Sequence, residues 1–168
     1  LIPMILYDFV LVALLPHKFS KWRIIQAGWI ANTFANIGGR GGVVGASIRL
    51  MFYGDEQVKK KDLLFALSKI GMFLLSGLSV LSIAILGAFL IPGYANHFIH
   101  YWPWLLGAGL YFPILWIITS TKKYGFFSDL TTNKKVVLIL ASTMEWFAAA
   151  GAFVAIGWLL NEPVDVIK

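Results

Sequence analysis

The stretch from Ile24 to Tyr53 reads IIQAGWIANTFANIGGRGGVVGASIRLMFY and is apolar enough to enter a membrane. Its middle, however, is the run GGRGG from Gly38 to Gly42, and Arg49 follows in the second half. Each glycine costs a helix about 1 kcal/mol and a mid-bilayer arginine costs more, so a single straight spanning helix is unfavourable here. Irregular backbone survives at membrane depth only where protein buries it or a wet cavity adjoins it. The stretch therefore predicts two half-helices that meet at a glycine elbow facing a polar site.

The composition of the whole chain is that of a membrane protein. Of its 168 residues, 59% are hydrophobic and 13% are charged, whereas soluble domains contain about 25% charged residues. The net charge of +6 resides in short segments between apolar runs, which argues against a nucleic-acid partner. The absence of cysteine excludes thiol catalysis, disulfides and cysteine metal sites. We expect an all-α, polytopic integral membrane helical bundle that contains the re-entrant, glycine-broken pair.

The first residues do not resemble a chain start. Residue 1 is not a methionine, and Leu1 to Met4 reads as the inside of a helix. No charged region or cleavage site of a signal peptide precedes the apolar residues. We therefore expect residues 1–168 to be part of a longer membrane protein.

Apolar segments alternate with charged or aromatic loops along the chain. Besides the broken stretch, we expect helices over 1–15, 63–91, 104–120 and 136–160. A span requires about 20 residues, and the last three segments are near or above that length. Lys69 lies near the start of the second segment, where its side chain can snorkel towards water.

The distribution of lysine and arginine predicts the topology. Segments 16–23, 54–62 and 121–135 carry three, three and four of them, whereas 92–103 carries none. The positive-inside rule assigns the basic segments to the cytoplasm. An even number of crossings must then separate 16–23 from 54–62, and thirty residues are too few for two spans. The broken stretch is therefore expected to be re-entrant; one tilted, kinked span with a misassigned loop is the alternative.

Four charges are expected at similar depth. At about 1.5 Å per residue, Asp8 lies about 11 Å into the membrane, Glu145 about 14 Å and Arg49 about 7 Å, with Arg40 near the midplane. Charges in the hydrocarbon layer typically mark substrate sites or pathways. The alternative is that these charges pair with one another and only hold the bundle together.

The glycines beside Arg40 suggest an anion site. They place the first N–H groups of the second half-helix at mid-membrane, where such groups can bind a phosphate. The alternative is that they form a small-residue packing face. His97 and His100 lie in the aromatic 92–103 segment without a third ligand, so we interpret them as interface anchors and predict no metal site.

Five groups of residues resemble a known family. They are Tyr7-Asp8, WIANTFAN from Trp29 to Asn36, the GGRGG run, GASIR from Gly45 to Arg49, and MEWF from Met144 to Phe147. Their order and spacing are similar to the transmembrane region of the multiple peptide resistance factor family, the bacterial lysylphosphatidylglycerol synthases and flippases. The resemblance extends over all 168 residues, and the cluster of Asn36, Gly38-Gly39, Gly45-Ala46 and Arg49 is its most specific part.

The resemblance implies a membrane flippase domain followed by a cytoplasmic domain that transfers lysine from lysyl-tRNA to phosphatidylglycerol. The flipped lipid lowers the negative charge of the outer leaflet and gives resistance to cationic antimicrobial peptides. In the family, the critical membrane charges match Asp8, Arg49 and Glu145. An apolar residue is usual at the position of Arg40, which implies a different head group or a divergent member.

The sequence thus predicts part of a lipid flippase domain in the bacterial cytoplasmic membrane. The candidate substrate-binding residues are Asp8, Asn32, Asn36, Gly38, Gly39, Arg40, Gly41, Gly42, Arg49 and Glu145. We expect the arginines and the elbow N–H groups to bind the phosphate of an aminoacyl-phosphatidylglycerol, and the carboxylates to bind its ammonium groups. No catalytic residue or cofactor is predicted for this segment; lysyl transfer would belong to the parent protein's other domain.

Two alternative functions remain open. One is a membrane anchor that presents lipid to the lysyltransferase domain. The other is an ion-coupled transporter of small solutes in which Asp8 and Glu145 carry protons. The expected partners are the phospholipid, the remaining helices and the C-terminal domain of the same protein, and the sequence is compatible with a homo-oligomer.

Overall fold

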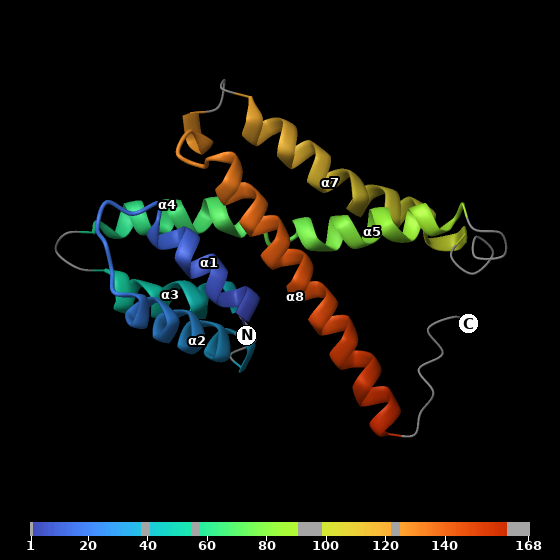
Figure 1. Cartoon of the computed structure of the whole chain (residues 1–168), viewed down its shortest axis with the longest axis horizontal. Helices are drawn as coiled ribbons and strands as arrows, with labels where there is room; N and C mark the ends of the chain where they lie inside the picture. Colours follow the sequence, from blue (N-terminus) through green and yellow to red (C-terminus); the bar gives the residue numbers. More distant parts are fainter. Residues whose placement is uncertain (1, 38–40, 55–57, 91–98, 122–124, 161–168) are drawn as a thin grey trace.

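A computed structural model describes residues 2–37, 41–54, 58–90, 99–121 and 125–160, and Figure 1 shows how its elements are arranged. The elements are α1 (Ile2–Val12), α2 (Lys21–Ile37), α3 (Gly41–Tyr53), α4 (Lys60–Gly71), α5 (Ser76–Ala88), η1 (Ile99–Tyr101), α7 (Trp102–Ser120), η2 (Gly125–Phe127) and α8 (Thr132–Leu159). The described residues contain no strand, so the all-α prediction is confirmed.

Three helical segments are long and apolar enough to cross a membrane. They are Lys60–Ala88, which comprises α4 and α5, Trp102–Ser120 and Thr132–Leu159. The three segments begin two to four residues before the starts expected from hydropathy. Polar residues form the added first turn of α4 and α8, where helical N–H groups need water or other partners, and Trp102 and Pro103 form that of α7. Lys134 and Lys135, expected in a loop, therefore belong to α8.

The broken stretch forms two helices, as predicted. Helices α2 and α3 pack against each other in opposite directions, and their facing ends lie about midway along the long axis of the molecule (Figure 1). They contain 17 and 13 residues rather than about 12 each, because α2 already begins at Lys21. Residues 38–40 lie outside the described part of the chain. The re-entrant position of this pair in a membrane remains a prediction.

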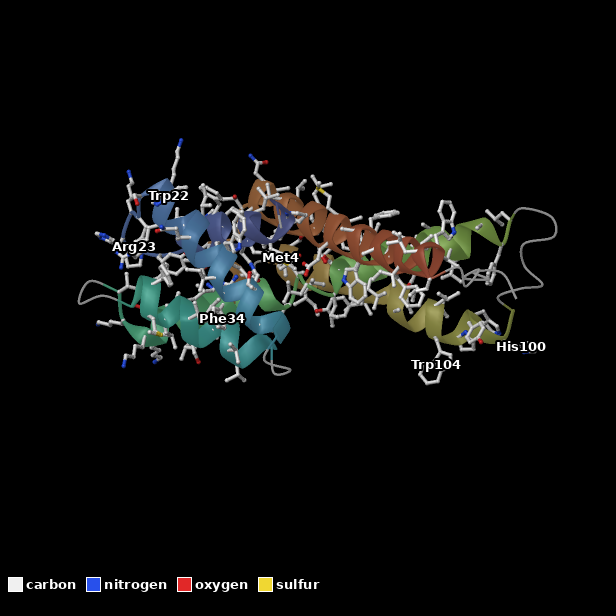
Figure 2. The ribbon with its side chains drawn as sticks, turned by 90° about the horizontal axis from the view of Figure 1, so that it is seen from below. Met4, Trp22, Arg23, Phe34, His100 and Trp104 are labelled. Carbon is white, nitrogen blue, oxygen red and sulfur yellow. The ribbon has the colours of Figure 1, made fainter. Side chains whose placement is uncertain are left out.

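Described residues of the basic segment before α2 and of the aromatic segment before α7 lie at opposite ends of the molecule. Figure 2 shows Trp22 and Arg23 at one end of the long axis, and His100 and Trp104 at the other. The basic segment before α2 and the aromatic segment before α7 were predicted to face opposite sides of the membrane. Their separation in space fits that prediction.

The span expected over 63–91 is present as Lys60–Ala88, but its helix is interrupted at residues 72–75, which the sequence did not predict. Phe73 and Leu74 donate to Ile70 and Gly71 at 2.8 and 3.2 Å, which tightens the backbone to i→i−3 bonding. Such a turn leaves carbonyl groups without helical partners. The Ser142 hydroxyl and the Trp146 indole N–H, both from α8, donate to the Leu74 carbonyl at 2.7 and 3.1 Å.

Helices α5 and α8 are in close contact beside the interruption at residues 72–75. The Gly77 N–H donates to the Ser142 hydroxyl at 2.8 Å, so that one hydroxyl bridges both sides of the interruption. A Cβ atom on Gly77 would collide with the backbone of Ser142 and Thr143. On the α7 side, the Tyr111 hydroxyl donates to the Met72 carbonyl at 2.5 Å. The interruption is therefore defined by partners from two other helices.

A second serine, Ser79, forms hydrogen bonds to the backbone of α7 beside Pro113. Pro113 has no N–H to donate to the carbonyl of Gly109, four residues earlier. The hydroxyl of Ser79 in α5 donates to that carbonyl at 2.7 Å and accepts the N–H of Phe112 at 2.9 Å. The α5–α7 interface thus replaces the hydrogen bond that Pro113 removes.

Lys69 does not snorkel to water, contrary to expectation. Its side chain is buried, and its ammonium group contacts both Asp129 carboxylate oxygens at 2.7 Å. The rings of Phe65 and Phe126 lie 4.7 and 5.3 Å from the same nitrogen. The segment between η2 and α8 brings Asp129 to α4, and the resulting ion pair offsets the cost of burying the lysine.

Candidate functional site

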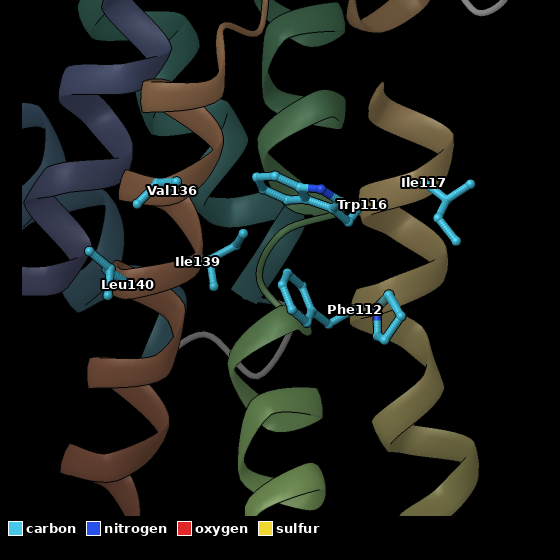
Figure 3. A pocket seen from close by; sticks show the side chains of 7 residues that line it. Phe112, Trp116, Ile117, Val136, Ile139 and Leu140 are labelled. Carbon is cyan, nitrogen blue, oxygen red and sulfur yellow. The ribbon is translucent and has the colours of Figure 1, made fainter. Parts of the chain in front are cut away.

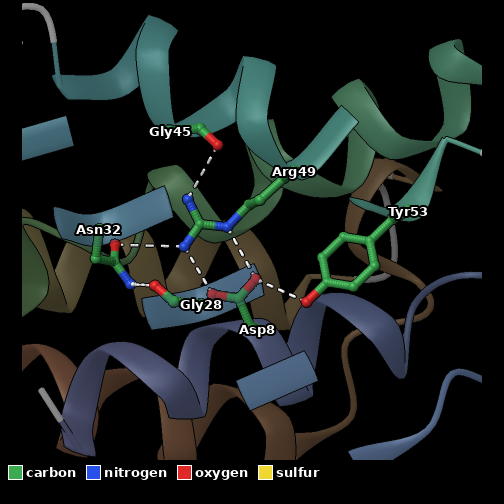
Figure 4. Close-up of polar contacts among 6 residues, drawn as sticks. All are labelled: Asp8, Gly28, Asn32, Gly45, Arg49 and Tyr53. Carbon is green, nitrogen blue, oxygen red and sulfur yellow. Dashed lines mark hydrogen bonds and ion pairs between the residues drawn. The ribbon is translucent and has the colours of Figure 1, made fainter. Parts of the chain in front are cut away.

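The Asp8 carboxylate in α1 and the Arg49 guanidinium in α3 form a two-pronged ion pair, shown in Figure 4. Arg49 Nε donates to Oδ1 at 2.9 Å and Nη2 donates to Oδ2 at 2.7 Å. The Tyr53 hydroxyl also donates to Oδ1, at 3.1 Å. The Asp8 side chain is fully buried and that of Arg49 is 12% exposed. The Asp8 carboxylate is therefore paired with Arg49, which agrees with the alternative that the membrane charges pair with one another.

Two glycines give this pair its space. Gly28 lies in α2, and a Cβ atom there would stand 3.0 Å from Asp8 Oδ2. A Cβ atom on Gly45 would stand 3.1 Å from Arg49 Nη1. Either added atom would come closer than ordinary van der Waals contact. The missing side chains thus let a carboxylate from α1 reach past α2 to an arginine on α3.

The remaining guanidinium hydrogens are only partly used. Nη2 also donates to the Asn32 Oδ1 atom at 3.3 Å, and Nη1 donates to the Gly45 carbonyl at 3.4 Å. The Asn32 amide is fixed by its own 2.7 Å donation to the Gly28 carbonyl. Because a guanidinium has five N–H donors, one Nη1 hydrogen has no partner among the described residues. Arg49 can therefore still donate to a ligand.

A cavity of about 280 Å³ adjoins Arg49. Its volume is near the lower limit of about 300 Å³ for small-molecule sites. The wall comes from five helices and the 72–75 interruption, and consists of Met4, Tyr7, Leu11, Asn32, Ala35, Gly42, Ala46, Arg49, Leu67, Ile70, Gly71, Leu74 and Glu145. Asp8 does not line it. The cavity therefore combines one guanidinium, one carboxyl and one amide with an otherwise mainly apolar wall.

Glu145 and Tyr7 face each other across one part of this cavity. Glu145 is half-buried and forms no salt bridge with any described residue. The Tyr7 side chain is 5% exposed, and its hydroxyl has no hydrogen-bond partner of good geometry among the described residues. The nearby polar groups are Ser142 and Glu145. A buried hydroxyl without a partner is costly, and a ligand that bonds to it would remove that cost.

The structure brings together part of the predicted site. Asn32, Gly42, Arg49 and Glu145 line the cavity, with Asp8 behind Arg49. For Asn36 and Gly41 only the helical backbone is described, and Gly38, Gly39 and Arg40 lie outside the described residues. Gly42 lies within α3, and a Cβ atom on it would meet nothing within 4 Å, so its small size leaves the cavity open.

Sequence reasoning did not assign roles to three residues of the site. Tyr53 and Gly28 contact Asp8, and Tyr7 lines the cavity. Tyr7 precedes Asp8 in the chain and was noted only as part of a motif. A tyrosine on a membrane helix next to a charge is a usable signal, because its hydroxyl needs a partner there. No signal identified Gly28, whose role depends on the packing of α1 against α2.

Comparison with known proteins relates the chain to one group. It is 33% identical over 154 residues to a phosphatidylglycerol lysyltransferase of Bacillus subtilis (strain 168), covering 87% of this chain and 18% of that protein. Proteins of the same name from Staphylococcus haemolyticus (strain JCSC1435) and Staphylococcus aureus (strain MRSA252) are 30% identical over 148 residues and 31% identical over 165. These matches cover 86% and 97% of this chain but 17% and 19% of the relatives.

The chain thus spans less than a fifth of the length of these curated relatives. No protein-family model matches the sequence, and no solved structure matches it significantly. The similarity extends over most of this chain, including the helices that form the cavity.

Proposed function

This chain belongs to the multiple peptide resistance factor family, and on that premise we propose that residues 1–168 form part of a domain that translocates an aminoacylated phosphatidylglycerol. The lipid would move from the inner to the outer leaflet of the bacterial cytoplasmic membrane. Its positive head group would reduce the negative charge of the outer surface and so give resistance to cationic antimicrobial peptides. The remaining helices and a lysyltransferase domain would belong to the longer parent protein.

One observation carries this proposal: a single cavity presents a donor group of Arg49 and the carboxyl of Glu145, which forms no salt bridge within the described part of the chain. An aminoacylated phosphatidylglycerol head group has a phosphate and at least one ammonium group. Arg49, together with the N–H groups at the start of α3, would bind the phosphate. Glu145 and the Tyr7 hydroxyl would bind the ammonium group. Because Asp8 does not line the cavity, we assign it to orienting Arg49.

The cavity volume supports a head group rather than a whole lipid. About 280 Å³ accommodates a glycerophosphate with an aminoacyl group but not two acyl chains. The chains would stay in the hydrocarbon layer while the head group passes between the helices. Most of the wall is apolar, so the charged groups would be the main determinants of which head group binds.

A second candidate is favoured by the relatives' name. A membrane segment of a lysyltransferase would present phosphatidylglycerol to the domain that modifies it. The same cavity would then bind the lipid during synthesis, and Arg49 would contact its phosphate. The two candidates differ in the step that fails when Glu145 is altered, because unmodified phosphatidylglycerol has no ammonium group for a carboxylate to bind.

We therefore predict that Glu145→Gln in the full-length protein leaves total aminoacylated lipid unchanged and lowers its outer-leaflet fraction about tenfold, the effect of one lost charge-assisted contact. A leaflet-specific amine label applied to intact cells, followed by lipid extraction, measures both quantities. Asp62→Asn is the matched control, since it removes an acidic charge from an exposed position on α4.

The outcomes separate the candidates. Unchanged synthesis with an unchanged outer fraction would fit lipid presentation instead, because unmodified phosphatidylglycerol offers Glu145 no ammonium group. A folded Glu145→Gln protein that synthesises and exposes the lipid normally would contradict the role proposed for Glu145. A similar loss in Asp62→Asn would show that the effect is not specific to the cavity.

A further inference from the structure

Lys135, in the first turns of α8, is a buried cation without a carboxylate partner. Its side chain is 5% exposed, and its ammonium group donates to the Thr119 carbonyl at 2.5 Å. The ring of Trp116 lies 5.7 Å from the same nitrogen. Neither salt bridge among the described residues includes Lys135. The end of α7 supplies only part of a negative charge, so most of the charge of Lys135 is left without compensation.

A polar cavity of about 450 Å³ surrounds this ammonium group. It is lined by Thr119, Ser120, Thr121, Phe127, Ser128, Leu130 and Lys135, and none of the described residues lines it with a carboxylate. The hydroxyls of Thr119, Thr121 and Ser128 donate only to carbonyls three residues earlier. Such local bonds can be exchanged for a bond to a ligand. Because an ammonium group has three donors, Lys135 also has hydrogens to offer an anion.

The structure also contains an apolar groove of about 540 Å³, whose lining side chains are shown in Figure 3. It lies between α7 and α8 and is lined by Phe112, Pro113, Trp116, Ile117, Val136, Ile139 and Leu140. Trp116 joins the two spaces, because its ring lines the groove and faces Lys135. Val136 follows Lys135 in the chain. Ile117 and Leu140 are 62% and 56% exposed, so the groove is open towards the surroundings of the bundle.

We propose that this end of the α7–α8 pair binds one anionic phospholipid. Its phosphodiester occupies the polar cavity against Lys135, and the first part of one acyl chain lies in the groove over Trp116. A basic cavity that leads into an apolar groove, at the end of two membrane helices, matches the division of a phospholipid into head group and chain. Charge complementarity favours a lipid over an apolar partner, because Lys135 would otherwise remain uncompensated.

The absence of a lining carboxylate determines which lipids bind. An ammonium-bearing head group would find no partner in this cavity and would be repelled by Lys135. The site therefore selects an anionic head group without an amine, in contrast to the cavity of Arg49 and Glu145. The two sites share no lining residue. The proposed lipid site consequently does not depend on the translocation function.

The test measures lipid retained by the purified full-length protein. Protein is reconstituted in nanodiscs of phosphatidylglycerol and phosphatidylcholine, extracted in mild detergent and analysed by native mass spectrometry. We expect Lys135→Met to reduce retained phosphatidylglycerol about tenfold relative to phosphatidylcholine, as the loss of one charge-assisted contact predicts. Lys134→Met is the matched control, because the adjacent Lys134 is only partly buried, does not line the cavity, and donates to the carbonyls of Ala13 and Asp129.

A second variant tests the groove without altering the charge. Leu140→Trp fills the groove and should also reduce retention, whereas the loss in Lys135→Met should persist in a Glu145→Gln background. Retention equal to wild type in Lys135→Met would overturn the proposal. An equal loss in Lys134→Met would do so too, because it would indicate a diffuse basic surface. Unchanged retention in Leu140→Trp would mean that another helix or a second copy covers the groove, not an acyl chain.

Discussion

Two helix interruptions adjoin the same cavity but differ in how the sequence encodes them. The chain turns back between α2, which ends at Ile37, and α3, which begins at Gly41, where the sequence contains the GGRGG run (Figure 1). Between α4 and α5, residues 72–75 break an apolar run that then continues in the same general direction (Figure 1). The α2–α3 pair is joined to α1 by an ion pair in the second half of α3, whereas neutral hydrogen bonds from other helices lie at the second interruption itself. A glycine run can therefore be recognised in a sequence, but a break made by packing cannot.

The largest difference concerns which side of the membrane the chain reaches after each interruption. Because α2 and α3 return the chain, single cysteines at Ser20, Gln57 and Ser128 should all react with a thiol label from the cytoplasmic side. A cysteine at Asn96, after α5, should react only from outside. Residues 1–168 contain no cysteine, so this part of the protein contributes no background labelling. Labelling at Gln57 from outside would show that the α2–α3 pair crosses the membrane, and the comparison would fail.

The charges near the first interruption should contribute more to stability than the neutral bonds near the second. Arg49→Met leaves the fully buried Asp8 with Tyr53 as its remaining partner. Breaking a buried ion pair in this way costs about 3–5 kcal/mol. We expect a corresponding loss in the free energy of unfolding, measured by denaturant titration in detergent micelles. The double variant Asp8→Asn, Arg49→Met should recover much of it, because no charge then remains unpaired.

Arg23→Met is the control for this pair of variants. Arg23 is exposed, its guanidinium lies 5.3 Å from the Phe19 ring, and its backbone N–H donates to the Ser20 hydroxyl. Its replacement should change stability by no more than about 0.5 kcal/mol. If Arg49→Met is as stable as Arg23→Met, the Asp8–Arg49 pair does not hold α1 to α3.

The same contrast explains what the sequence could and could not predict. Hydropathy and charge predicted the helices, the α2–α3 break and the positions of Arg49 and Glu145, because these depend on local composition. The partner of Asp8 stayed one of two alternatives, since it depends on Gly28 letting the carboxylate past α2. The burial of Lys69 was missed because Asp129 lies 60 residues away in the chain. Ser142 and Trp146 gave no signal, because their acceptor is a backbone carbonyl of another helix.

The smallest expected effect tests whether packing makes the second interruption. Gly77→Ala adds a Cβ atom that would collide with the Ser142 backbone, so α5 and α8 must separate. Overpacking of this kind costs about 1–3 kcal/mol, partly offset by the gain of about 1 kcal/mol for replacing glycine by alanine in a helix. We expect a net loss of about 1 kcal/mol in unfolding free energy. Gly87→Ala, one residue from the other end of α5 and with nothing within 4 Å of the added atom, should be neutral or stabilising. Equal behaviour of the two variants would mean that contact with α8 does not define the break, and that the apolar run interrupts itself.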